Sequence, residues 1–216
     1  MYSILLFDLD GTLTDPKIGI TTCVQYALGK MGIKEPDLDK LIPFIGPPLT
    51  YSFKEYYHLN DDEAAQAIDY YRERFSTIGL YENAVFPDVP ELLQALHNQG
   101  KTLIVATSKP TVYSVQILEH FGLNHFFQAI VGSNLDGTRV EKHEVIEYAL
   151  SELGDYDRNK VIMIGDRMHD ILGAKRNGID VVGVTYGYGS REELEQAQPN
   201  HIVETVAELR NFLVEG

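Results

Sequence analysis

Two aspartates follow directly on a short apolar run near the amino terminus, and this stretch constrains the fold more than any other. The run Ile4–Phe7 predicts a strand buried on both faces of a parallel sheet, and Asp8 and Asp10 follow it, next to Gly11 and Thr12. Open α/β sheets bind their ligands at the carboxyl ends of the strands. The pair is therefore expected at a ligand site, although a bare Asp-x-Asp-Gly sequence also occurs in ordinary turns.

The spacing of these two aspartates has a chemical consequence. Residues i and i+2 of an extended strand share a face, so the carboxylates of Asp8 and Asp10 repel each other unless a cation or a proton separates their roles. Mg²⁺ favours oxygen ligands and bridges readily to phosphate. With such an ion bound, one carboxylate can act as a nucleophile while the other carries a proton as general acid and base.

The chain beyond Pro87 alternates helical and strand patterns, which is typical of parallel βαβ units. Together with the first strand, these patterns predict an α/β fold whose core is a Rossmann-like parallel sheet made of residues 1–14 and 85–216. The further strands are expected at residues 102–106, 128–131, 161–164 and 181–184, with a short edge strand at residues 202–203.

Residues 15–84 have a different character, because they carry helix-period apolar positions and no strand pattern. They are expected to form an inserted, all-helical domain. Cys23 lies in an apolar helical stretch of this insert and is expected in its core. The expected helices cover residues 18–32, residues 38–42, and a segment capped by Asp61 or Asp62 that ends at Phe75.

Composition excludes several classes of function. The formal charge of −14 argues against nucleic acid or an anionic membrane as a partner, because both require a basic surface. No apolar run approaches the roughly 20 residues of a membrane span, and the amino-terminal stretch lacks a signal-peptide pattern, so a cytoplasmic protein is expected. The single cysteine excludes an intrachain disulfide and a cysteine zinc cluster. Any phosphate site must therefore be local, built from a metal ion, backbone amides and a few lysines.

Polar residues follow the other predicted strands at the same structural position. Thr107 and Ser108 come after the strand at residues 102–106, ahead of a proline that can begin a helix, where hydroxyl and amide groups can bind an anion. Lys142 stands at a predicted helix start, where a cation is disfavoured by the helix dipole unless it pairs with a phosphate or carboxylate. Asp166 and Asp170 follow the strand at residues 161–164, one helical turn apart, and offer a second acidic pair to a metal.

The chain resembles the haloacid dehalogenase (HAD) superfamily, whose four ordered motifs match residues 8–12, residues 107–109, Lys142 and residues 165–170. The helical insert looks like the C1 cap of the branch that contains phosphoglycolate phosphatases and 5′-nucleotidases. Two positions depart from the usual pattern: Lys142 is followed by His143, where many relatives have proline, and His169 stands where many have asparagine.

The resemblance implies roles for individual residues. It implies that Asp8 is the nucleophile, Asp10 the acid and base, and that the cap closes over the substrate. The residues with implied catalytic roles are Asp8, Asp10, Thr107 and Lys142. Those implied to bind the substrate phosphate are Gly11, Thr12, Thr107, Ser108 and Lys142. The implied Mg²⁺ ligands are Asp8, Asp10 through its main-chain carbonyl, Asp166 and, in support, Asp170.

The expected function is therefore a magnesium-dependent phosphatase. Its substrate would be a small phosphorylated metabolite, phosphoglycolate or a nucleoside 5′-monophosphate, hydrolysed through an aspartyl phosphate. A dehalogenase is disfavoured because that chemistry does not use an acid/base at Asp10, and a phosphorylated receiver domain is disfavoured by the helical insert. Two alternatives stay open: a β-phosphoglucomutase-like phosphosugar mutase and a non-catalytic phosphate-binding module.

Overall fold

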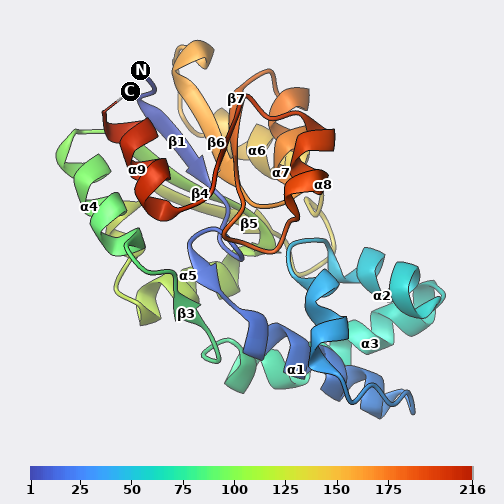
Figure 1. Ribbon diagram of the computed structural model, residues 1–216. Coiled ribbons are helices and arrows are strands. Elements are labelled where there is room, and N and C mark those ends of the chain that lie inside the picture. Colours follow the sequence, from blue (N-terminus) through green and yellow to red (C-terminus); the bar gives the residue numbers. More distant parts are fainter. Residues whose placement is uncertain (216) are drawn as a thin grey trace. The chain divides into compact units, whose positions relative to one another are not determined.

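A parallel sheet of six strands forms the core of the first of two compact units, which comprises Met1–Asp15 and the chain from Val85 onward (Figure 1). The computed structural model describes residues 1–215. The strand order is β5-β4-β1-β6-β7-β8, and neighbouring strands pair in parallel. The strands are β1 (Ile4–Phe7), β4 (Thr102–Pro110), β5 (Ala129–Ser133), β6 (Val161–Gly165), β7 (Asp180–Val184) and β8 (His201–Val203).

The register of the sheet explains why residues far apart in sequence meet. Phe7 at the end of β1 lies opposite Val105 of β4 and Ile164 of β6. The residues that follow these three strand positions therefore emerge at one edge of the sheet. The predicted α/β fold with a Rossmann-like sheet is confirmed.

Helices cover both faces of this sheet. One face packs against α4 (Val89–Asn98), α5 (Thr111–His120) and α9 (Val206–Val214), and the other against α6 (Lys142–Ser151), α7 (Met168–Arg176) and α8 (Arg191–Ala197) (Figure 1). On the second face, one apolar core joins sheet residues such as Leu6 and Met163 to Val145, Ile171 and Leu194 of the three helices. This burial holds the helix starts at the carboxyl edge of the sheet.

Two features of this unit were not predicted from the sequence. The helix α8 was not predicted because its seven residues are mostly charged, and only Leu194 and Ala197 of them are buried. The strand β4 runs to Pro110 rather than ending at residue 106, because its register with β5 shifts after Ala106 and pairing resumes between Pro110 and Ser133.

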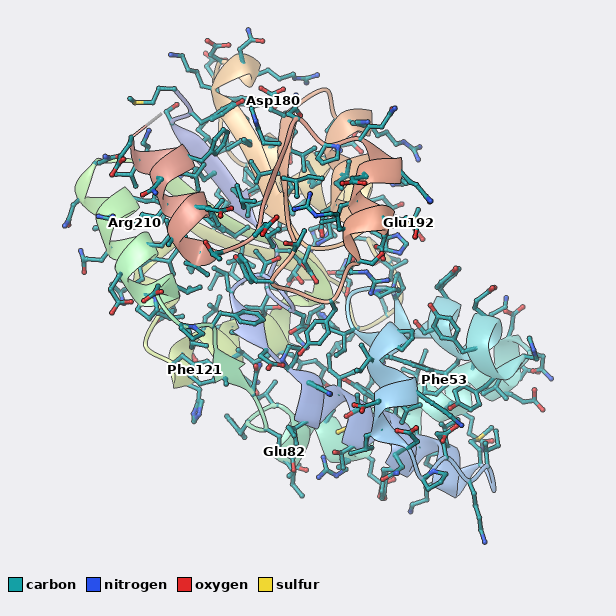
Figure 2. All side chains as sticks on the ribbon, viewed as in Figure 1. Phe53, Glu82, Phe121, Asp180, Glu192 and Arg210 are labelled. Atoms are coloured by element: carbon teal, nitrogen blue, oxygen red, sulfur yellow. The ribbon has the colours of Figure 1, made fainter. Side chains whose placement is uncertain are left out.

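The second unit, Pro16–Ala84, is helical. Phe53 lies among its helices, fully buried, with its ring 5.0 Å from that of Phe44 (Figure 2). Cys23 is fully buried, which confirms the prediction that it belongs to the core. The helices are α1 (Lys17–Lys30), η1 (Leu38–Phe44), α2 (Leu49–Tyr57), α3 (Asp61–Arg74) and the π-helical turn η2 (Phe75–Gly79).

Short elements complete the chain. The strands β2 (Thr14–Asp15) and β3 (Ala84–Val85) form a separate two-stranded sheet, and η3 (Asn124–Phe126) and η4 (Arg158–Lys160) are single 3₁₀ turns. Among residues 1–215, every helix is too short or too polar to cross a lipid bilayer.

The start of α3 corrects one prediction. Neither Asp61 nor Asp62 caps this helix; the cap is Asn60, whose side chain accepts a hydrogen bond from the Glu63 amide at 3.0 Å. The Glu63 carboxylate in turn accepts a hydrogen bond from the Asn60 amide at 2.9 Å, which completes a capping box. The two aspartates lie in the first turn instead, where their charges favour the positive end of the helix dipole.

Replacing Asn60 with alanine is expected to destabilise the protein by about 1 kcal/mol, because the Glu63 amide at the start of α3 loses its side-chain acceptor. Urea unfolding followed by far-ultraviolet circular dichroism measures this change, and the chain has no tryptophan to report it by fluorescence. The matched control is Asp62→Ala, which removes only a charge near the helix dipole. A larger loss for Asp62→Ala than for Asn60→Ala would contradict the assignment of the cap.

Candidate active site

All charged side chains that are buried among residues 1–215 lie together at the carboxyl edge of the sheet or just beyond it. Four carry negative charge and two carry positive charge, which leaves a net charge of −2 if all six are ionised. They are Asp8, Asp10, Lys109, Lys142, Asp166 and Asp170. A buried excess of negative charge is costly without a counterion, so this group of side chains is suited to a divalent cation.

Lys142 is the centre of the first part of the site. It is the first residue of α6, and its Nζ lies 2.7 Å from Oδ1 of Asp8 and 2.7 Å from Oδ1 of Asp170. The same ammonium group donates a hydrogen bond to the carbonyl oxygen of Ala106 at 3.1 Å. Burial by itself lowers the pKa of Lys142, but Asp170 and Asp8 outweigh burial and raise that pKa above its ordinary value. The lysine therefore stays charged at neutral pH, and the ion pairs explain its place at a helix start.

Asp166 is held by neutral groups rather than by a cation. The amide of Tyr188 donates a hydrogen bond to its Oδ2 at 2.8 Å, and the hydroxyl of Thr12 donates to its Oδ1 at 3.3 Å. No ion pair joins Asp166 to a basic side chain in the part of the chain that the structure describes. Burial, followed by repulsion from Asp170 and Asp8, raises the pKa of Asp166 well above its ordinary value.

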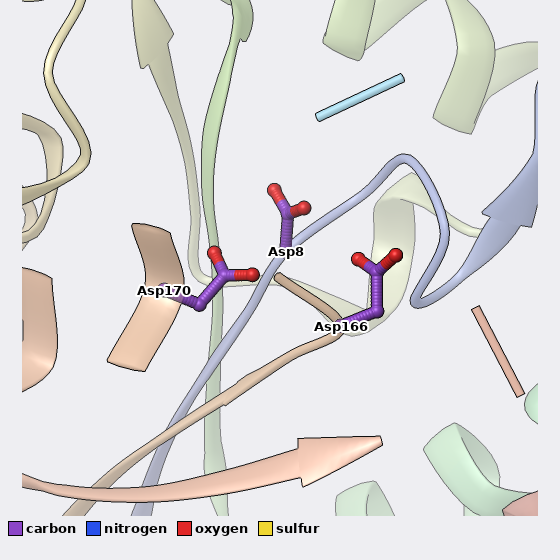
Figure 3. A group of neighbouring side chains, drawn as sticks. All are labelled: Asp8, Asp166 and Asp170. Carbon is purple, nitrogen blue, oxygen red and sulfur yellow. The ribbon is translucent and has the colours of Figure 1, made fainter. Parts of the chain in front are cut away.

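Three of the carboxylates are arranged as a metal site. Asp8, Asp166 and Asp170 each offer one oxygen, and these oxygens lie within 4.8 Å of one another (Figure 3). Every donor is a carboxylate oxygen, the kind of ligand that Mg²⁺ prefers. Burial and then the neighbouring Asp8 charge raise the pKa of Asp170, against the effect of Lys142. A bound divalent cation would remove this repulsion, so the residues fit the ion that the sequence predicted.

Asp10 faces a different partner. Its Oδ2 lies 2.6 Å from Nζ of Lys109, while its buried Oδ1 has no hydrogen-bond partner among residues 1–215. Burial raises the pKa of Asp10, and Lys109 opposes that rise. The side chain of Asp10 is therefore separate from the group of three carboxylates, and its predicted contribution to a metal stays one of its main-chain carbonyl.

The remaining predicted residues divide into two groups. Thr107 and Ser108 lie near the end of β4 beside this site, and their role toward phosphate stays a prediction. Gly11 and Thr12 have other partners: the Gly11 amide donates to the carbonyl of Thr14 at 2.8 Å, and Thr12 is fully buried against Asp166. The Thr12 contact orients Asp166, and the binding of phosphate by Gly11 and Thr12 stays a prediction.

Glycines line the buried charges because a side chain at these positions would collide with the aspartates or with the backbone beside them. A Cβ atom on Gly187 would overlap the Gly11 carbonyl oxygen and the Asp166 side chain, and one on Gly189 would overlap the Asp166 carbonyl oxygen. Gly165 leaves room for Asp170 in the same way. Gly11 combines such a close approach to Asp166 with a φ of +85°, a conformation that favours glycine.

Some contributors to the site escaped sequence reasoning. Lys109 carried a signal, because it lies two residues after Thr107 in an extended segment and so shares its face. The Tyr188 amide was not among the predicted site groups, and its only signal is the pair of glycines that flank it, Gly187 and Gly189. Glu193 accepts hydrogen bonds from the Met168 amide at 2.8 Å and from Nε of Arg167 at 2.9 Å, and it belongs to the unpredicted α8.

Comparison with known proteins connects this geometry to a family. The family model described as haloacid dehalogenase-like hydrolase matches residues 5–184. A 5′-nucleotidase of Pseudomonas aeruginosa is 52% identical over 212 residues, which cover 98% of this chain and 96% of that protein. Tyrosine-protein kinase PtkA of Mycobacterium tuberculosis is 35% identical over 97% of this chain and 72% of that protein. The crystal structure of a predicted phosphatase from Clostridium acetobutylicum superposes with a TM-score of 0.97 and 50% identity, over all of both chains.

Without divalent metal, the folded protein is expected to lose stability as the pH rises. The pKa values of Asp10, Asp166 and Asp170 are raised by folding, so the folded chain binds their protons more tightly than the unfolded chain does. Their contribution is complete below about pH 4 and is lost as the pH rises through the raised folded pKa values. Thermal unfolding in chelator at successive pH values measures this, and a Mg²⁺ concentration of about 100 times Kd should restore about 3 kcal/mol at neutral pH.

The matched variants for this measurement are Asp166→Asn and Asp136→Asn. The first removes a buried charge and should raise the melting temperature in chelator while abolishing most of the stabilisation by Mg²⁺. Asp136 is exposed on a loop, and its replacement should leave the stabilisation by Mg²⁺ unchanged. A metal-free wild-type protein that gains stability from weakly acidic to neutral pH would contradict the account of the buried carboxylates.

Gly187→Ala is expected to weaken both the fold and the binding of metal. The added methyl group must displace the backbone at Gly11 or the side chain of Asp166, which should cost about 1–3 kcal/mol of folding free energy. Because Asp166 moves, Mn²⁺ affinity measured by calorimetry should fall by about 10–100-fold. Gly29→Ala in α1 is the control, since a Cβ atom there meets open space and should stabilise the helix slightly. Unchanged Mn²⁺ affinity in Gly187→Ala would show that the glycine does not position Asp166.

Proposed function

The chain belongs to the haloacid dehalogenase-like hydrolases and is a phosphoric monoester hydrolase, and on this premise we propose that it is a Mg²⁺-dependent phosphatase of nucleoside 5′-monophosphates. Its chemistry is hydrolysis through an aspartyl phosphate on Asp8.

The single observation that carries this proposal is the arrangement of Asp8 within the buried charges. Lys142 holds one oxygen of Asp8 at 2.7 Å. Asp8, Asp166 and Asp170 each offer an oxygen, and these oxygens lie close enough to one another to share an ion. Phosphoryl transfer needs a positioned nucleophile and strong neutralisation of charge, with little other covalent chemistry. The site offers both within one group of side chains.

The residues of the chain then act in two steps. An oxygen of Asp8 attacks the phosphorus, the ester bond breaks, and the carboxyl group of Asp10 gives its proton to the leaving oxygen. In the second step the carboxylate of Asp10 takes a proton from water as that water attacks the phosphorus. The bond between phosphorus and Asp8 breaks, and inorganic phosphate leaves.

Positive charge for these steps comes from two sources. Asp8, Asp166, Asp170 and the main-chain carbonyl of Asp10 would hold Mg²⁺, which when bound supplies charge that neutralises the phosphate oxygens. Lys142 keeps Asp8 oriented and stabilises the charge that develops on the transferring group. Thr107 and the Ser108 amide, at the end of β4, would hold phosphate oxygens.

The choice of substrate rests on the comparisons. The relative named 5′-nucleotidase is 52% identical over almost the whole of both chains, which favours a nucleoside 5′-monophosphate over phosphoglycolate. A phosphosugar mutase would need to bind a second phosphate, for which arginine is best suited. Residues 15–71 contain no arginine, which disfavours that alternative.

Release of inorganic phosphate from a substrate panel tests the proposal. The panel contains nucleoside 5′-monophosphates, phosphoglycolate and sugar phosphates, each with Mg²⁺ or with chelator. We expect turnover of the nucleotides that requires Mg²⁺ and that falls by at least about a thousandfold in Asp8→Asn, because an amide oxygen is a poor nucleophile. Asp8→Asn should still fold, since it keeps the size of the side chain.

The controls separate the alternatives. Asp136→Asn, on an exposed loop, should leave turnover unchanged. Turnover of phosphoglycolate alone would change the substrate and keep the mechanism, whereas activity that survives chelator or Asp8→Asn would reject the mechanism. Interconversion of phosphosugars without phosphate release would favour the mutase, and transfer of phosphate from ATP to a tyrosine peptide would favour the activity in the name of one relative.

A further inference from the structure

Lys109 is a buried lysine that the proposed reaction does not use. Its side chain is only 5% exposed, and its Nζ lies 2.6 Å from Oδ2 of Asp10, whose side chain is 9% exposed. The two buried lysines therefore have different partners, since Lys142 pairs with Asp8 and Asp170. Lys109 is the basic group paired with the acid/base residue.

The two oxygens of Asp10 are in unequal surroundings. Lys109 holds Oδ2, while Oδ1 is buried and finds no hydrogen-bond partner in the part of the chain that the structure describes. A carboxyl group that donates a proton needs one oxygen directed at the leaving group, and its rotation must be restricted for the transfer to be efficient. The ion pair between Lys109 and Oδ2 restricts the rotation of Asp10 and leaves Oδ1 available to donate the proton.

The backbone of Lys109 is itself braced from two strands. Its amide donates to Oγ1 of Thr107 at 3.3 Å, and a Cβ atom on Gly132 of β5 would overlap its carbonyl oxygen. The hydroxyl of Ser133 donates to the carbonyl of Ser108 at 2.8 Å, one residue before the lysine. These contacts fix the backbone position of Lys109. Its ammonium group can therefore hold the Asp10 carboxylate in one place.

We propose that Lys109 is a positioning residue, which holds Asp10 by Oδ2 so that Oδ1 faces the leaving oxygen of the substrate. This inference rests on the proposed function, because it assigns to Asp10 the proton that the leaving oxygen receives. In that step the bond from Asp8 to phosphorus forms, the ester bond breaks, and the proton of Asp10 moves to the oxygen that departs as an alcohol. A lysine that only balanced buried charge would instead affect every substrate equally.

The test compares two leaving groups in Lys109→Met. An alkyl ester such as a nucleoside 5′-monophosphate must receive a proton as it leaves, whereas 2,4-dinitrophenyl phosphate releases a stable anion without one. The value of kcat/KM reports the steps up to departure of the leaving group, so it excludes the later use of Asp10 with water. We expect Lys109→Met to lower kcat/KM for the alkyl ester by about 100-fold and for the dinitrophenyl ester by no more than about threefold.

Three further variants complete the experiment. Asp10→Asn is the reference and should show the same selective loss, and Lys109→Arg should recover part of the activity toward the alkyl ester. Lys160→Met, an exposed lysine on η4, should leave both values unchanged. If Lys109→Met does not fold, Lys109→Gln is measured with the same two substrates. A larger loss of kcat/KM on the alkyl ester than on the dinitrophenyl ester then supports the positioning role, and equal losses contradict it.

The outcomes separate this inference from the proposed function. Equal losses on both esters in the Lys109 variants, with selective loss in Asp10→Asn, would overturn the positioning role and keep the phosphatase. A wild-type protein that hydrolyses neither ester, or an Asp10→Asn variant without selectivity, would overturn the proposed function and this inference with it.

Discussion

Repulsion among four buried aspartates is the constraint on which the rest of this structure depends. Within residues 1–215, only two buried lysines accompany them, and the two ammonium groups pair with Asp8, Asp10 and Asp170 but not with Asp166. Burial of like charges opposes folding, so the hydrophobic packing of the sheet and its helices must outweigh it. A divalent cation bound by these carboxylates would recover part of the stability that the fold gives up at this edge of the sheet.

A parallel sheet makes this concentration of charge feasible. The ends of β1, β4 and β6 lie side by side, so short chain segments after each strand can present side chains to one point. Asp8 and Lys142 are 134 residues apart in the chain yet form a direct hydrogen bond. The start of α6 supplies the lysine, and the first turn of α7 supplies Asp170, while α8 fixes the start of α7 through Glu193.

Much of the candidate site was predictable because its residues directly follow predicted strands or begin predicted helices. Asp8, Asp166 and Asp170 come directly after apolar runs or one helical turn later, and Lys142 opens a helix, so sequence spacing places all four. Lys109 carried only the weak signal of sharing a face with Thr107. The Tyr188 amide depends on the close packing around Gly187, which sequence spacing does not reveal. The Asn60 cap shows the same limit at small scale, since three adjacent polar residues compete for one position and only the backbone angles decide between them.

The glycines that line the buried charges also bear on how this protein can change. Methyl groups at Gly11, Gly165, Gly187 and Gly189 would each collide with an aspartate or with the backbone beside it. A larger side chain at any of these glycines would move the carboxylates. A mutagenesis library that seeks new substrates therefore gains almost no active variants from these four positions. New specificity must arise from codons outside them, and a library that spares these four glycine codons will lose fewer members to inactive protein.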